Sequence, residues 1–188
     1  MKVISILGSP REKGNTVKVL DWVEDELRSL GHQVDRVNVV DHTIGGCLGC
    51  RRCQGVLDDL GCAQDDDAQA IFQRMMAADI ILWASPLFFW DFPSQLKALI
   101  DRQYCFVTGY GGPSYRSLAE GKKSAMLVTC DGPVEGNANL IVELFRRMSA
   151  YLKMAAVADL VVPFCAMPDQ PGDEAKTKAK ALAREIVA

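Results

Sequence analysis

Four of the seven cysteines lie within sixteen residues, and their spacing is a strong chemical signal. They read Cys47-x-x-Cys50-x-x-Cys53, followed after eight residues by Cys62. Thiolates at this spacing can converge on a 4Fe–4S cluster, because each iron takes one cysteine and the short loops let the sulfurs meet. Zinc also takes four thiolates, more often from two separated Cys-x-x-Cys pairs. Free thiols without a metal are the third alternative.

A second group of polar residues follows an apolar run near the N-terminus, in Gly8-Ser-Pro-Arg-Glu-Lys-Gly-Asn-Thr16. It offers the hydroxyls of Ser9 and Thr16, the amide of Asn15, the cation of Arg11 and the N–H groups of a helix start. Together these suit a phosphate monoester. The segment matches neither the dinucleotide glycine pattern nor the phosphate-loop lysine pattern. A helix cap by Asn15 or Thr16 is the structural alternative.

Two further segments complete the chemical inventory. Ala84-Ser-Pro-Leu-Phe-Phe-Trp-Asp-Phe-Pro93 crowds four aromatic residues just after another apolar run. These residues suit the core, a dimer interface or a planar apolar ligand. The short segment 129–136 contains Asp131 and Gly132 and also follows an apolar run. No Ser-His-Asp or paired-carboxylate pattern supports hydrolase chemistry.

Alternating strand and helix patterns must position these segments. Short apolar runs predict five strands, and apolar residues spaced by three and four predict five helices. The strands are expected at 3–7, 33–40, 80–84, 122–130 and 155–162, and the helices near 15–30, 68–76, 93–102, 140–152 and 174–187. Residues 41–64 show no period and form a long cysteine-rich loop, and loops of that length usually carry function.

This alternation predicts one α/β domain over residues 1–188, built on a doubly wound parallel sheet. The flavodoxin-like strand order 2-1-3-4-5 fits five strands. In that fold ligands bind beyond the carboxyl ends of the strands, where the phosphate segment and the aromatic segment would meet. That combination suits FMN.

Composition narrows the partners. The net charge is −3, from 21 basic and 24 acidic residues, so nothing favours binding to nucleic acid. The most apolar stretch, 80–90, is shorter than the ~20 residues that span a bilayer, and the N-terminus lacks a signal-peptide pattern. We therefore expect a cytoplasmic protein without a membrane partner.

On these motifs the sequence resembles the NADPH-dependent FMN reductase family, in particular its iron-sulfur flavoprotein branch. Gly8-Ser-Pro-Arg with Gly14-Asn-Thr is similar to the family's FMN-phosphate loop, and Ser85-Pro-Leu-Phe-Phe to the loop that holds the isoalloxazine ring. The resemblance implies phosphate contacts from Ser9, Arg11, Asn15 and Thr16, a flavin lining of Pro86, Leu87, Phe88 and Phe89, Asp131 and Gly132 near the ring, and cluster ligands Cys47, Cys50, Cys53 and Cys62. The gap before Cys62 is longer than the branch's usual gap.

The implied activity is NAD(P)H-linked reduction of flavin, a quinone or another small-molecule electron acceptor. The flavin carries the chemistry, so no side chain is assigned as catalytic. The alternative is an electron carrier between ferredoxin and an acceptor, without nicotinamide use. Relatives assemble as homodimers or homotetramers, so an oligomer is expected. The glycine-rich segment 108–121, with its tyrosines, is expected to form a lid or an interface over the ring.

Overall fold

In a computed structural model, which describes residues 1–56 and 58–188, the central sheet has the strand order β2-β1-β3-β6-β7. All neighbouring strands run parallel. Counted among themselves, these five strands follow the predicted order 2-1-3-4-5. Their bounds are β1 Lys2–Leu7, β2 Gln33–Asn38, β3 Ile80–Pro86, β6 Lys123–Thr129 and β7 Ala155–Val162.

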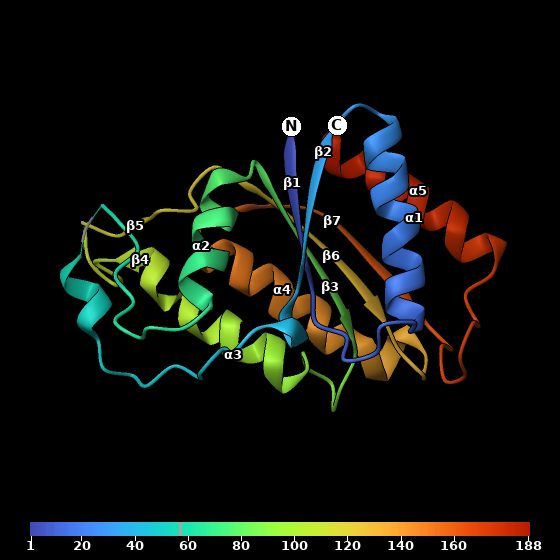
Figure 1. Ribbon diagram of the computed structural model, residues 1–188, viewed down its shortest axis with the longest axis horizontal. Coiled ribbons are helices and arrows are strands. Elements are labelled where there is room, and N and C mark those ends of the chain that lie inside the picture. The colour runs from blue at the N-terminus through green and yellow to red at the C-terminus, as the bar shows by residue number, and fades with distance from the viewer. Residues whose placement is uncertain (57) are drawn as a thin grey trace.

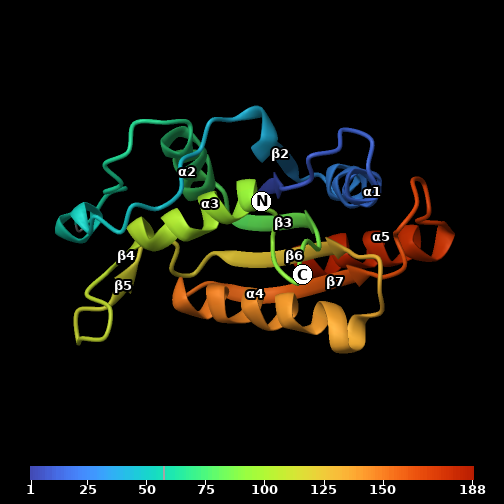
Figure 2. The ribbon, with the colours of Figure 1, turned by 90° about the horizontal axis from the view of Figure 1, so that it is seen from below.

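Five α-helices cover the two faces of this sheet (Figure 1). They are α1 Asn15–Ser29, α2 Ala68–Ala77, α3 Ser94–Arg102, α4 Asn139–Tyr151 and α5 Asp173–Val187. One core cluster joins the sheet to α2, α3 and α4, and the other joins it to α1 and α5. The helices α4 and α5 therefore lie on opposite sides of β7 (Figure 2).

The central strands are buried on both faces, as the unbroken apolar runs predict. Every residue of β3 from Ile80 to Ala84 is fully buried, including the large side chain of Trp83. Burying a large apolar side chain contributes ~1.5–3 kcal/mol, so these strands form a rigid support for the loops at their carboxyl ends. Among the helices of the described residues, none is both long and apolar enough to cross a bilayer.

The glycine-rich segment contains a small hairpin. Two short antiparallel strands, β4 Val107–Thr108 and β5 Arg116–Ser117, form a small hairpin there. The Tyr115 hydroxyl donates to the carbonyl oxygen of Tyr151, and the Tyr110 ring lies 4.9 Å from the Tyr151 ring. The hairpin therefore packs on the last turn of α4, because its tyrosines find partners there.

Candidate functional site

A cavity of about 200 Å³ lies at the carboxyl ends of β1, β3, β6 and β7. We call it the strand-end cavity. Four loops that are far apart in the sequence meet there, as the doubly wound topology requires. Its lining residues are Ser9, Pro10, Arg11, Gly14, Asn15, Thr16, Pro86, Leu87, Phe88, Thr129, Cys130, Asp131, Cys165 and Ala166.

The loop before α1 presents donors to this cavity. The Ser9 side chain is buried, and its Oγ accepts the N–H of Arg11 at 3.2 Å. Gly14 is the N-cap of α1, which has no side-chain cap and no acidic residue in its first turn. A Cβ on Gly14 would stand 3.2 Å from Cβ of Arg11, so the glycine lets the loop fold tightly. The positive end of the helix dipole, together with the hydroxyls and the exposed Arg11, suits an anion.

Thr16 reaches the cavity through a contact that sequence reasoning missed. Its Oγ1 lies 2.6 Å from Oγ1 of Thr129, and both side chains are buried. The bond joins the first turn of α1 to the last residue of β6. One sequence feature could have identified Thr129 as a site residue: it lies two residues before Asp131, near the end of a predicted strand. This hydroxyl pair fixes the inner wall of the cavity.

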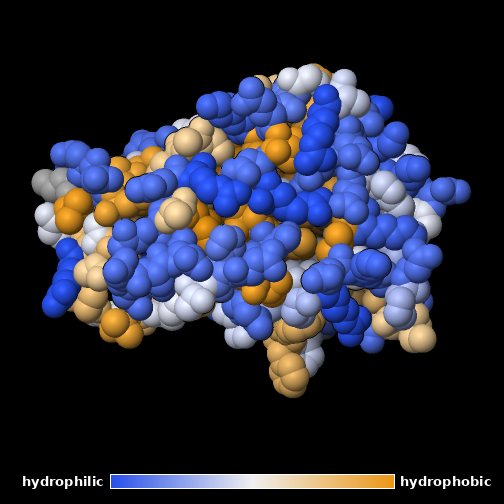
Figure 3. All heavy atoms as spheres, viewed as in Figure 1, coloured by the Kyte–Doolittle hydropathy of each residue, from blue (hydrophilic) through white to orange (hydrophobic). Residues whose placement is uncertain are grey.

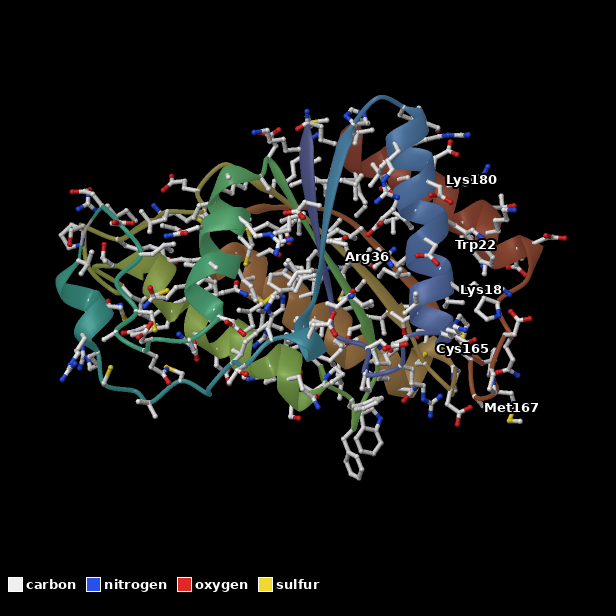
Figure 4. The ribbon with its side chains drawn as sticks, in the orientation of Figure 1. Lys18, Trp22, Arg36, Cys165, Met167 and Lys180 are labelled. Atoms are coloured by element: carbon white, nitrogen blue, oxygen red, sulfur yellow. The ribbon has the colours of Figure 1, made fainter. Side chains whose placement is uncertain are left out.

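Asn15 lines the cavity, but its amide hydrogens are engaged elsewhere. Its Nδ2 donates to the carbonyl oxygens of Cys165 at 3.0 Å and Met167 at 2.8 Å. Figure 4 shows Cys165 and Met167 beside the lower end of α1. The Asn15 Oδ1 is buried without a hydrogen-bond partner. Asn15 thus anchors the loop after β7, and its donors are already engaged, whereas a phosphate oxygen requires a donor.

The loop after β3 forms the apolar wall. Pro86, Leu87 and Phe88 line the cavity, and the Leu87 N–H donates to the carbonyl oxygen of Thr129 at 2.9 Å. Phe89 does not line it, because its side chain points to solvent and is 94% exposed. Of the third predicted segment, Asp131 lines the cavity and Gly132 does not; Gly132 instead faces the side chain of Asn137.

Two cysteines also face this cavity. Cys130 packs with the core on the α2–α4 side of the sheet, and Cys165 packs against the core on the α1–α5 side. Burial raises the pKa of Cys130 to about 11, and burial raises that of Cys165 as well. Both thiols are therefore neutral near pH 7. They act as weakly polar wall residues and add no negative charge beside Arg11.

The predicted cysteine set is not brought together. Cys47 and Cys50 are exposed, Cys53 is buried and Cys62 is partly buried. Among the described residues, no three His, Cys, Asp or Glu side chains converge closely enough to hold a metal ion. Figure 1 shows this segment (teal) at the end of the molecule opposite the loop before α1. As placed here, the four thiols do not fit a cluster.

The cysteine loop is held by a buried arginine. The Arg102 side chain, on α3, is fully buried and pairs with Asp66, and its Nη2 donates to Sγ of Cys62 at 3.3 Å. Burial opposes ionisation of the Asp66 carboxyl. Hydrogen bonds from Arg102 and from the N–H groups of Gly45 and Ala68 outweigh that effect and hold the pKa of Asp66 below its usual value. Neither sequence periodicity nor spacing predicts this pair.

A larger cavity lies elsewhere, between α3 and α4, with a volume of about 720 Å³. Its walls are mainly apolar, and its charged residues pair along their own helices, Lys97 with Asp101 and Arg147 with Glu143. It is lined by residues at or beside α3 and α4, and it does not lie at the carboxyl ends of the strands, where this fold places its ligands. We therefore place the anion-binding chemistry in the smaller cavity.

The sequence pattern of the NADPH-dependent FMN reductase family matches residues 1–169. The chain belongs to this family. Its FMN cofactor and its class, an FMN-dependent NAD(P)H oxidoreductase, agree with the prediction from the sequence. The predicted iron-sulfur branch also agrees with an iron-sulfur flavoprotein of Archaeoglobus fulgidus, which is 31% identical over 188 residues, covering 99% of this chain and 79% of the relative.

Other similarities are more local or more distant. An iron-sulfur flavoprotein of Methanosarcina thermophila is 35% identical over 102 residues, about half of each chain (54% and 52%). An FMN-dependent NADH:quinone oxidoreductase of Delftia acidovorans is 28% identical, covering 80% of this chain and 73% of its own. The solved FMN-dependent NADH-azoreductase from Bacillus anthracis, in complex with FMN, shares the fold with a TM-score of 0.73, at 15% identity and full coverage of both chains.

Proposed function

We propose that the strand-end cavity is the FMN site of this reductase, and that the physiological reaction is NAD(P)H-linked reduction of a quinone or a similar small electron acceptor. The observation that carries this proposal is one of placement. The uncapped N-terminus of α1 and the apolar loop after β3 face the same cavity. These two walls suit a ligand that has an anion at one end and a planar apolar group at the other, as flavin mononucleotide has.

The chain's residues divide this work between them. Ser9, Arg11 and Thr16, with the N–H groups at the start of α1, would hold the phosphate. Asn15 would hold the loop after β7 against the start of α1, in place of the phosphate contact predicted for this residue. Pro86, Leu87 and Phe88 would line the ring, and Asp131 would stand at its polar edge. Phe89 and Gly132 do not line the cavity and are given no contact with FMN.

FMN, when bound, would supply the two-electron chemistry between the nicotinamide and the acceptor. The protein's contribution is to bind, orient and limit water. The neutral thiols of Cys130 and Cys165 support this, because they add no charge that would compete for the phosphate. The overall reaction is NAD(P)H + H⁺ + quinone → NAD(P)⁺ + hydroquinone.

Stopped-flow mixing tests the proposal directly. Anaerobic protein loaded with FMN is mixed with NADPH or NADH, and the flavin absorbance is followed. Fast bleaching, followed by recovery when a quinone is added, supports the reductase. A flavin that neither nicotinamide bleaches, but that reduced ferredoxin does, would replace the reductase with an electron carrier.

That carrier is the second candidate, and the names of the iron-sulfur flavoprotein relatives favour it. Its cluster would use Cys47, Cys50, Cys53 and Cys62, which requires the two exposed cysteines to move toward the other two. About four irons and four acid-labile sulfides per chain after anaerobic preparation would support this set. Cys50→Ser would then remove the broad visible absorption and keep the FMN bands. One zinc per chain, or four titratable thiols without metal, would assign the loop to one of the other two alternatives.

Two broader expectations remain predictions. Assembly as a homodimer or homotetramer has a suitable surface in the mainly apolar cavity between α3 and α4, where Leu140 is exposed. Sedimentation velocity measures the assembly. The cytoplasmic location rests on the sequence alone.

A further inference from the structure

Phe89 and Trp90 form the tip of a tight turn after β3. The turn is closed by two backbone hydrogen bonds, from the Phe88 N–H to the Asp91 carbonyl oxygen at 2.9 Å and from the Asp91 N–H to the Phe88 carbonyl oxygen at 3.0 Å. Both tip residues have positive φ angles, 48° at Phe89 and 63° at Trp90. Turns with two positive φ angles in succession strongly favour asparagine and glycine at these positions.

The two aromatic side chains are largely or half exposed. Phe89 is 94% exposed and Trp90 is 51% exposed. Their rings contact each other edge to face, with centroids 5.7 Å apart. Bulky residues at positive φ strain the backbone, and such strain is concentrated at functional sites. The chain therefore keeps two large rings at a position where both the backbone and the solvent disfavour them.

The position of the turn connects it to the strand-end cavity. The residues at its base, Leu87 and Phe88, line that cavity. In Figure 1 the turn is the green loop that projects below the sheet, and Figure 3 shows an apolar projection at the same place. The cavity of about 200 Å³ is smaller than the ~300–1,000 Å³ of typical ligand pockets. A flavin anchored by its phosphate would therefore extend its ring system to the cavity mouth, beside the turn.

We propose that Phe89 and Trp90 are a stacking platform for the planar ring of the electron acceptor, and thus select aromatic acceptors such as two-ring quinones. This inference rests on the proposed function of the same site. Aromatic rings pair edge to face or offset, so the exposed faces of this pair can receive a flat ring. A second copy of the chain is a poorer occupant, because a stable interface buries ~800 Å² per partner, far more than two side chains offer.

The test replaces both tip residues by those that the turn prefers, in Phe89→Asn/Trp90→Gly. The holoprotein is assayed with NADPH and either menadione, a two-ring quinone, or ferricyanide, a non-aromatic acceptor. We expect a higher melting temperature, FMN affinity within twofold of wild type, and KM for menadione raised about tenfold, equivalent to ~1.4 kcal/mol. The KM for ferricyanide should stay within twofold.

Phe164→Asn is the matched control. Phe164 also follows a strand, has a φ of 58° and is 63% exposed, but it does not line the cavity. Its replacement should likewise raise the melting temperature and leave both KM values unchanged. An unchanged KM for menadione in the double variant overturns the platform, as does an equal rise for both acceptors. A change in sedimentation coefficient would make the tip an interface. Wild-type protein that binds no FMN would instead defeat the proposed function.

Discussion

The strand-end cavity and the cysteine loop hold their chemistry in different ways. In the cavity, Ser9 and Thr16 are 5% and 3% exposed, and a hydroxyl pair and backbone bonds tie the four loops to the sheet. In the loop, Cys47 and Cys50 are exposed, and the buried Arg102–Asp66 pair anchors the segment from one side. The cavity walls are thus held by contacts within the chain itself, whereas a metal in the loop would have to order its own ligands.

The comparison shows what a parallel sheet provides to a site. Residues at the ends of neighbouring strands are brought together by the topology, whatever ligand is present. Residues on a long connecting loop have no such frame, and metal binding then supplies part of the folding free energy. The two regions should therefore respond independently to substitution, which the following variants examine.

Arg102→Met should have the largest effect. Removing one partner of a buried ion pair leaves Asp66 without its cation, so the free energy of unfolding should fall by about 3 kcal/mol. Urea unfolding without FMN measures it. The dissociation constant of FMN should remain within twofold of wild type, because no described residue of the loop lines the strand-end cavity.

Lys97→Met is the control for that variant. Lys97 pairs with Asp101 on the same helix, but both side chains are partly exposed, so the loss should stay below ~1 kcal/mol. If FMN affinity falls in parallel with stability in Arg102→Met, the two regions are coupled and the comparison fails.

Arg11→Gln should weaken FMN binding about tenfold and leave riboflavin binding unchanged. A hydrogen bond to a charged group contributes ~1.5–3 kcal/mol, and Arg11 is exposed, so its loss should not unfold the chain. Titration calorimetry on apoprotein measures both ligands. Lys13→Gln removes the same charge from the same loop, but Lys13 lines a neighbouring cavity. Equal losses of FMN affinity in the two variants would show that long-range charge, and not a direct contact of Arg11, causes the effect.

Asp66 should make stability depend on acid pH. Its pKa in the folded protein is lowered, against about 3.9 in an unfolded chain, so its contribution is present above pH ~4 and is lost as pH falls through the folded value. Asp66→Asn should flatten the fall in unfolding free energy between pH 5 and 3. Glu174→Gln should change it less, because the hydrogen bond from Lys178 that lowers the pKa of Glu174 is exposed to solvent. If the unfolding free energy of Asp66→Asn falls between pH 5 and 3 as much as that of the wild type, Asp66 does not cause this pH dependence.

The sequence predicts the sheet and much of the cavity because local patterns encode both. Apolar runs that stop at glycine, serine or proline locate the strand ends, and the topology then brings Ser9, Pro86 and Asp131 to one edge. What it misses depends on long-range contacts. Thr129 joins the site through Thr16, and the amide of Asn15 is directed to a loop 150 residues away. No local pattern carries either contact.

Charge on a helix is a second source of error. Arg102 ends α3, where a basic residue normally faces solvent and complements the helix dipole. Here Cys62 of the cysteine loop and Asp66, just after it, approach and enclose the side chain. The prediction that Phe89 lines the cavity fails for a different reason. The turn after Phe88 reverses the chain before the next residue can reach the cavity.

The central claim is that the strand-end cavity binds FMN through its phosphate. Titration calorimetry of FMN and of riboflavin into apoprotein tests it most directly, because the two ligands differ only in that group. The contacts offered by Ser9, Arg11, Thr16 and the α1 N-terminus predict at least tenfold tighter binding of FMN. Equal affinity for the two ligands would contradict the assignment of this cavity.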